Sequence, residues 1–188
     1  MRNTRGSLQF STAVADWRQY LMPVRPVTVA VRALHIGRYG RDAEHIQLAK
    51  YYAGHQQLIH GYGFGQFEPG ECGAFERNTC AVFDRLVGSR LLVMNAEVRA
   101  PLLGLFRGEI DYGSYVPVEI AAFFDAGVTW SIGSKPALAG GDRAFVRSYG
   151  AALRANIFGF FTLELAASRA IDRVGRPLKW QLGMVQGF

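Results

Sequence analysis

The chain has 188 residues, a length that fits one domain or part of a larger one. Hydrophobic residues make up 49% of it and aromatic residues 13%, which is too apolar for a disordered chain. The net charge is +6, and 18 of the 21 basic residues are arginines, but they are scattered singly and form no basic stripe. We therefore expect no nucleic-acid partner.

No stretch of the sequence reaches the ~18 uncharged apolar residues of a membrane helix. A transmembrane β-barrel would escape that test, because its strands alternate between apolar and polar residues. Residues 1–6 lack the apolar core of a signal peptide. The start of the chain therefore fits either a cytosolic protein or the rear part of a longer exported chain.

Apolar and polar residues alternate in seven runs, which predicts seven β-strands. The runs cover residues 8–20, 27–37, 87–100, 118–130, 147–157, 161–168 and 179–188. They are longer than the ~5–6 residues usual in soluble strands and close to the ~9–11 residues that cross a membrane. Their connections alternate between short and long, as in outer-membrane barrels, although the connection over residues 101–116 is longer than that rule favours.

The two faces of these runs differ in polarity. The apolar face carries Trp130, Tyr149 and Trp180, placed where an aromatic girdle would fall. The other face carries Arg, Glu, Asp and Asn and would line a lumen. A soluble sandwich or barrel with its apolar face inward is the alternative, but strand length, loop asymmetry and the terminal Phe188 favour the membrane. We predict an all-β fold, an antiparallel transmembrane β-barrel with about 7–8 strands in this chain.

The longest connection, residues 38–85, has no clear periodic element, and such a loop is usually functional. Its glycine-rich tip, residues 58–65, predicts a tight turn with close backbone approach. Cys72 and Cys80 lie in its polar part, where a local disulfide would suit an oxidising compartment and free thiols are the alternative. No metal-ligand spacing is present and no cofactor is indicated.

Several motifs, in order, resemble the C-terminal barrel region of the outer-membrane assembly-factor family (BamA/TamA, the bacterial surface antigen barrels). The resemblance runs from about residue 8 to residue 188. It is carried by these segments: residues 51–54 with 58–62, then 95–101, 123–130, 148–154 and 180–188.

This resemblance implies that residues 1–188 form a single barrel domain that is incomplete, the C-terminal half of a sixteen-stranded barrel. Residues 38–85 would be an extracellular loop folded into the lumen, and Cys72 and Cys80 fall where some members carry a disulfide. The barrel would be completed by missing N-terminal strands or by a second copy of the chain; closure of a small barrel by this chain alone is a further possibility.

In the family, an arginine at the loop tip pairs with carboxylates on two neighbouring strands. This pairing, which holds the loop tip on the barrel wall, is here called the lock. Carried over to this sequence, the lock consists of His60, Gly61 and Tyr62 at the tip, with Glu97 and Asp125 as the acids. This sequence has His60 where arginine is expected, so we predict a pH-dependent lock. Other cations could serve in its place: Arg32, Arg99 and Arg154.

The last strand resembles the recognition signal of outer-membrane strands through Gln181, Gly183 and Phe188, although Gln186 departs from it. We therefore expect a non-enzymatic protein of the bacterial outer membrane that assembles or translocates proteins, with membrane lipid and outer-membrane client proteins as partners. A passive pore or structural barrel is the alternative. Two further alternatives are an enzyme that uses His60, Glu97 and Asp125 as acid and base, and a soluble barrel that binds an apolar ligand.

Overall fold

The structure is a computed structural model that describes residues 8–67, 71, 81–102, 118–157, 160–175 and 178–185. Seven long strands form one sheet: β1 (Ser11–Val24), β2 (Val27–Tyr39), β5 (Arg90–Pro101), β6 (Val118–Trp130), β7 (Val146–Ile157), β8 (Phe161–Ala170) and β9 (Leu178–Val185). The connections contain β3 (Tyr51–Tyr52), α1 (Ala81–Asp84), β4 (Val87–Gly88) and the short 3-10 helix η1 (Ala137–Ala139).

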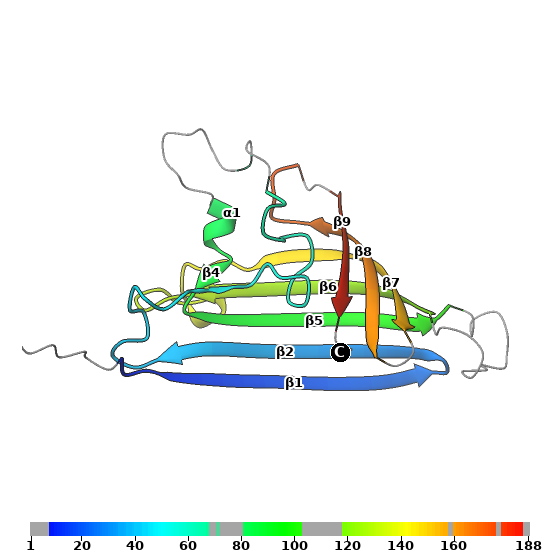
Figure 1. The fold of residues 1–188 in the computed structure, drawn as a ribbon, viewed down its shortest axis with the longest axis horizontal. Coiled ribbons are helices and arrows are strands. Elements are labelled where there is room, and N and C mark those ends of the chain that lie inside the picture. The colour runs from blue at the N-terminus through cyan, green and yellow to red at the C-terminus, as the bar shows by residue number, and fades with distance from the viewer. Residues whose placement is uncertain are drawn as a thin grey trace, which may run out of the picture.

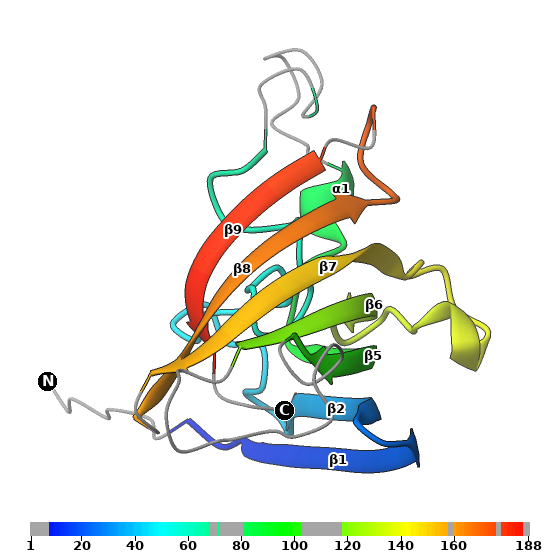
Figure 2. The same cartoon turned by 90° about the vertical axis from the view of Figure 1, so that its right-hand side faces the viewer.

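The sheet follows the chain, in the order β1-β2-β5-β6-β7-β8-β9, and every neighbouring pair is antiparallel. It curls strongly, so that β9 runs steeply across the direction of β1 (Figure 1). Within the described residues β1 and β9 do not pair, and they form two open edges (Figure 2). The predicted all-β antiparallel fold is confirmed, and the described part of the chain forms an open curved wall.

The connections between the strands lie at the two ends of the wall. At one end, here called the loop end, lie the described parts of three connections, residues 40–89, 131–145 and 171–177. At the opposite turn end, β1 passes to β2 through residues 25–26. Successive side chains on a strand point to opposite faces, so each strand contributes one set of residues to each side of the wall.

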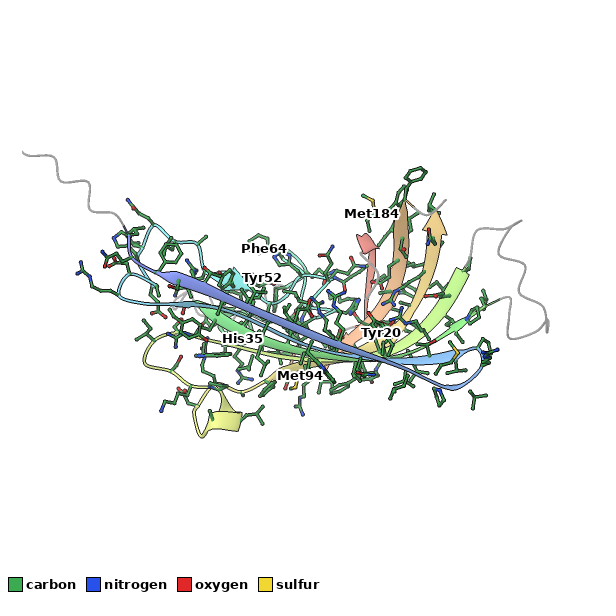
Figure 3. All side chains as sticks on the ribbon, turned by 90° about the horizontal axis from the view of Figure 1, so that it is seen from below. Tyr20, His35, Tyr52, Phe64, Met94 and Met184 are labelled. Atoms are coloured by element: carbon green, nitrogen blue, oxygen red, sulfur yellow. The ribbon has the colours of Figure 1, made fainter. Side chains whose placement is uncertain are left out.

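The convex side, here called the outer face, is apolar. On β5 it carries Leu92, Met94, Ala96 and Val98, as the alternation predicts, and Met94 is 37% exposed and Val98 47% exposed. Figure 3 shows Met94 on this side and the loop residues Tyr52 and Phe64 on the opposite, concave side. The concave side, here called the inner face, carries the buried polar residues Asn95, Glu97 and Asp125.

The hydrophobic core lies between the inner face and the long loop. Leu34, Leu91, Val93 and Val146 come from the strands, and Ile59 and Tyr62 come from the loop. All of them are at most 4% exposed. An open sheet has no opposite wall to pack against, so the folded-in loop covers the apolar part of the inner face at the loop end.

Two details of the strands differ from the prediction. The first predicted strand ends near residue 20, whereas β1 continues to Val24 through a register shift between Leu21 and Val24. Proline is tolerated on edge strands and at bulges, so Pro23 does not end the strand. The loop also contains the β3–β4 ladder and α1, whose few residues are too short for a periodic pattern to predict. No helix in the described part of the chain is long and apolar enough to cross a membrane.

The polarity of the two faces predicts which one meets lipid. Leu153 lies on the outer face of β7 and is 43% exposed. Replacing it with arginine should lower the free energy of unfolding in a bilayer by about 2–4 kcal/mol, because a charge would enter hydrocarbon. Urea unfolding of the full-length protein in lipid vesicles measures this change.

The matched control is Ile46→Arg, because Ile46 is 95% exposed on the loop and should tolerate the charge. Equal stability of the two variants would mean that the outer face does not contact hydrocarbon.

Candidate functional site

The loop tip lies directly on the inner face of the sheet. Ile59 and Tyr62 are fully buried there, and the Tyr62 hydroxyl donates to the Arg147 carbonyl at 2.8 Å. Gly61 has φ of +81°, and a Cβ at this position would lie 3.1 Å from Ser168 Oγ on β8. Glycine therefore meets two requirements at once, a left-handed backbone and close approach to the strand.

His60, beside this glycine, lies between two buried carboxylates. Its Nδ1 is 2.7 Å from Asp125 Oδ2 on β6, and its Nε2 is 3.1 Å from Glu164 Oε1 on β8. Its backbone N–H also donates to Asp125 Oδ2 at 3.0 Å. The ring packs against Phe123, with centroids 4.1 Å apart. One loop side chain therefore ties together two strands that are not neighbours.

This geometry requires a protonated His60. An ionised carboxylate can only accept hydrogen bonds, so an imidazole between two of them binds both only when both ring nitrogens carry hydrogen. Burial by itself would lower the pKa of His60, but the hydrogen bonds to Asp125 and Glu164 outweigh burial and raise the pKa to about 9. His60 is therefore a cation at neutral pH.

Arg154 on β7 holds the remaining buried acid. Its Nε is 2.6 Å from Glu164 Oε2, and its NH2 is 2.7 Å from Glu97 Oε2 on β5. Arg99 adds a second cation, with its Nε 3.1 Å from Glu97 Oε1. The resulting row alternates in sign: Asp125, His60, Glu164, Arg154, Glu97 and Arg99. Three acids face three cations, and the row is neutral only when His60 is protonated.

The oxygen atoms of Asp125 are held by the sheet as well as by the loop. Asn95 Nδ2 donates to Asp125 Oδ1 at 2.8 Å and to the Leu58 carbonyl at 2.7 Å. Ser148 Oγ donates to Asp125 Oδ2 at 3.3 Å. The bonds from Asn95 and Ser148 hold the carboxylate in place on the sheet, and the Asn95 amide also binds the loop backbone.

The loop contacts β8 and β9 through glutamine side chains. The Gly61 N–H donates to Gln181 Oε1 on β9 at 2.9 Å, and Gln56 Nε2 donates to Glu164 Oε1 on β8 at 3.0 Å. Gly183 lies against the Gln56 side chain, which a Cβ at position 183 would meet at 2.4 Å. The last strand is thus packed against the lock.

A second clamp comes from the β8–β9 connection. Arg173 is 3% exposed, and its NH1 donates to the Gly61 carbonyl at 2.7 Å. Its NH2 donates to the Gln66 carbonyl at 2.7 Å, and its Nε to Glu71 Oε2 at 2.7 Å. Its guanidinium also lies 4.6 Å from the Phe67 ring centroid. Arg173 therefore binds the loop at two backbone carbonyls and one carboxylate.

The structure corrects one expected contact, because Glu97 pairs with Arg154 and not with His60. Asn95 is the register partner of Asp125, whereas Glu97 stands opposite Phe123. Glu97 is thus two residues farther along β5, roughly 7 Å toward the turn end, and reaches the lock only through Arg154.

The other predicted site residues have the following places. Arg32 pairs with Asp16 on β1, with its Nε 2.9 Å from Asp16 Oδ1, and lies outside the lock. Gln181 and Gly183 face the loop, and their contribution to a sorting signal stays a prediction. Cys72, Cys80 and Phe188 lie outside the described residues.

Sequence reasoning missed Glu164 and Arg173 as members of the site. Glu164 is the one acid of β8 and has apolar residues on both sides along the chain, as Asp125 has on β6, and this shared pattern was a usable signal. Arg173 lies in a short polar connection that carries no such pattern, so only the folded structure reveals its role.

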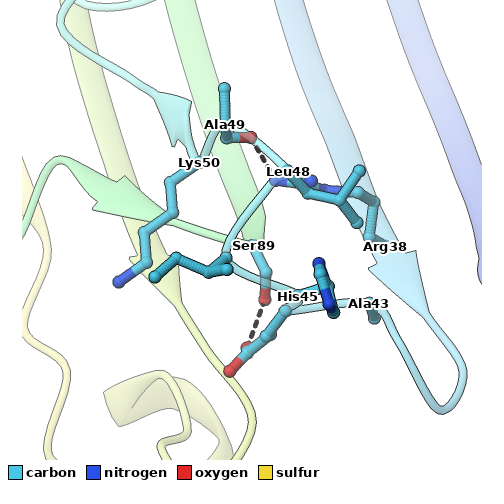
Figure 4. Close-up of a pocket in the computed structure, with 9 residues that line it drawn as sticks. Arg38, Ala43, His45, Leu48, Ala49, Lys50 and Ser89 are labelled. Carbon is cyan, nitrogen blue, oxygen red and sulfur yellow. Dashed lines mark hydrogen bonds between the residues drawn. The ribbon is translucent and has the colours of Figure 1, made fainter. Parts of the chain in front are cut away.

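The first part of the loop also lines an open cavity of about 420 Å³ beside β2 (Figure 4). Its polar groups bind one another: Ser89 Oγ donates to Glu44 Oε1 at 2.6 Å, and Arg38 NH2 donates to the Ala49 carbonyl. These bonds stabilise the base of the loop. Within the described residues no group of three or more His, Cys, Asp or Glu side chains could hold a metal ion.

The protonated lock makes stability depend on pH. The pKa of His60 rises from 6.5 to about 9 on folding, so its contribution is complete below about pH 6.5 and is lost as the pH rises through 9. The change corresponds to about 3 kcal/mol of unfolding free energy. Urea unfolding at pH 6, 7.5 and 9.5 should show this decrease for the native protein. His60→Gln should abolish it, and an unchanged pH dependence in that variant would refute the lock.

Replacing Arg154 should lower the free energy of unfolding far more than replacing an exposed arginine of the same sheet. Arg154→Met leaves Glu97 and Glu164 without their shared cation and should cost about 3–5 kcal/mol of unfolding free energy. Arg18→Met removes an exposed partner of Asp16, which keeps Arg32, and should cost less than about 1 kcal/mol. Similar losses in both variants would show that the buried row is not the stronger element.

Comparison with known proteins agrees with this arrangement. A family model for the Omp85 superfamily domain matches residues 6–183, nearly the whole chain. No curated protein and no solved structure gives a match. The matched range contains the loop, the buried row of charges and most of the seven-stranded sheet. The chain belongs to the Omp85 superfamily, a family of outer-membrane β-barrels.

Proposed function

We propose that this chain is the C-terminal part of an outer-membrane barrel that assembles or translocates proteins. The observation that carries this proposal is the inward-folded loop, whose tip is bound to β6 and β8 by His60. A loop tied to the inner wall fills the lumen at the loop end, which suits a gated barrel better than a permanently open channel. The family match supports the outer membrane as its location.

The direction of the strands supports a particular way of closing the barrel. All six pairs are antiparallel, so β1 and β9 both run from the loop end of the wall to the turn end. An odd number of added strands would let every neighbour in the closed barrel be antiparallel, as in single-chain bacterial barrels. A second copy in the same membrane orientation would place β9 of one chain parallel to β1 of the other. We therefore favour a partner segment with an odd number of strands.

The loop also bridges the two sides of the open wall. The Gln57 carbonyl accepts from Arg32 NH1 on β2 at 3.4 Å, while Gln57 Nε2 donates to the Met184 carbonyl on β9 at 3.5 Å. Both contacts are long, but they join the second strand of the order to the last. The loop thereby supports the curvature of the wall in the region that the partner strands would complete.

The passive-pore alternative rests on the charged inner face near β1. Asp16 binds both Arg18 and Arg32 there, and its strand is exposed along its whole length. Charged side chains on a lumen wall can set ion preference. An enzymatic role finds less support, because both ring nitrogens of His60 are engaged by carboxylates and none is left to act as a base.

Reconstitution of the full-length protein in lipid bilayers tests the proposed function through two readouts. Vesicles that contain it should speed the insertion of an unfolded outer-membrane protein, measured as acquired protease resistance. Planar bilayers should show low conductance, and His60→Ala should increase the frequency of open currents severalfold, because the loop loses its cation between two acids.

The matched control is His45→Ala, because His45 is exposed on the same loop and lies outside the lock. Large steady currents from the unmodified protein, without any insertion activity, would favour the passive pore instead.

A further inference from the structure

The charged side chains on the outer face of the described strands are all basic, and they all lie near the loop end of the wall. Among the outward-facing positions of the described strands, His35 aside, the charged residues are Arg90, Arg147 and Arg169. Each lies at or one residue from the loop-end terminus of its strand. No acidic residue occupies an outward-facing position of these strands.

The three arginines differ in how far they are neutralised. Arg147 forms a salt bridge with Asp172, with NH2 3.0 Å from Oδ1. Arg169 is exposed on β8, and its register partner is the outward-facing Tyr149 on β7, which is 48% exposed. Arg90 interacts electrostatically with Glu44 of the loop, so Arg169 carries the least compensated positive charge of this rim.

The side chain of Arg90 is held in place by Tyr39, His35 and Trp130, an arrangement here called the Arg90 seat. Its guanidinium lies 4.6 Å from the centroid of the Tyr39 ring, and its Nε donates to the Arg38 carbonyl at 3.2 Å. The Tyr39 hydroxyl is 2.7 Å from His35 Nε2, and His35 stacks on Trp130 with centroids 5.5 Å apart. Within the described residues, the two terminal nitrogens of Arg90 make no hydrogen bond, so they remain available as donors.

Gly37 makes this seat possible. Arg90 is its register partner on β5, and a Cβ at position 37 would lie 2.9 Å from Tyr39 Cε2 and 3.1 Å from His35 Nε2. The absent side chain lets the Tyr39 ring fold back across β2 toward His35. The guanidinium then rests on an aromatic surface that is already in position.

We propose that this outer rim, formed by Arg90 and Arg169 with Tyr39, Trp130 and Tyr149, binds the phosphorylated headgroups of anionic lipids in the leaflet at the loop end. The inference rests on the proposed outer-membrane location. Arginine presents paired donors that fit phosphate oxygens, and tyrosine and tryptophan belong at the boundary between hydrocarbon and headgroups.

A lipid headgroup suits this rim better than free phosphate. The donors stand directly above apolar outer-face residues such as Leu92, the next outward-facing position on β5. An anionic lipid can satisfy both surfaces at once, with its phosphate on the arginines and its acyl chains on the strands. Because β6 and β7 separate Arg90 from Arg169, the two residues contact separate headgroups.

Native mass spectrometry of the full-length protein in non-ionic detergent tests this proposal. Phosphatidylglycerol should bind in preference to phosphatidylcholine, and millimolar inorganic phosphate should not displace it. Arg90→Gln and Arg169→Gln should each weaken phosphatidylglycerol binding about fivefold. Gly37→Ala should weaken it in the same direction with no change in charge, because the Cβ displaces Tyr39 from beneath Arg90. Arg41→Gln is the matched control, since Arg41 is exposed on the loop at the same end of the wall.

Equal binding of the two lipids, or unchanged binding in both rim variants, would overturn the proposal. Displacement by inorganic phosphate alone would identify a general anion site instead. Fractionation of cells that express the native protein distinguishes failure of the lipid site from failure of the proposed function. If the native protein lies in the outer membrane but lacks the preference, only the lipid site fails. If it is absent from the membrane, the proposed function fails as well.

Discussion

The structure depends on the neutralisation of three buried acids on the inner face of an open sheet. Asp125 and Glu164 are at most 1% exposed and Glu97 is 2% exposed. An isolated carboxylate in such a place would be very costly, so each must meet a cation or be protonated. The sheet itself offers Arg154 and Arg99, which balance two acids. The third positive charge comes from the loop, and the sheet is electrically complete only when the loop is seated.

This requirement links the loop to strands that do not touch one another. His60 contacts β6 and β8, Gly61 contacts Gln181 on β9, and Arg173 returns from the β8–β9 connection to hold the same backbone. Displacing the tip would therefore expose apolar residues of the core and also leave two carboxylates without their shared cation. Full displacement of the tip would break its contacts with β6, β8 and β9 together, at a high cost in free energy.

Local patterns and non-local contacts were not equally predictable. Alternation along β5 and β6 predicted correctly that one face is apolar and the other carries the charged residues, because the side-chain period of a strand is a local property. The carboxylate partners of His60, in contrast, depend on contacts between residues that are far apart in the sequence. Choosing between Glu97 and Glu164 requires the register of β5 against β6 and the depth to which the loop enters, and neither is encoded near those residues. The Arg90 seat was missed for the same reason, since it joins side chains from β2, β5 and β6.

Because the tip residue is histidine, a second cation, Arg154, is required to bind Glu97. Arginine has five donors in a fixed fork, whereas a protonated imidazole has two, directed to opposite sides of the ring. His60 uses one donor for Asp125 and one for Glu164, so it has none left for Glu97, and Arg154 joins Glu97 to the row. Loss of the proton removes only one of the two ring donors. The Asp125 carboxylate would still accept from the His60 backbone N–H, and Arg173 would still hold the Gly61 carbonyl. Deprotonation therefore removes one of the two ring contacts while these backbone contacts persist, a weakening that a permanently charged arginine would not allow.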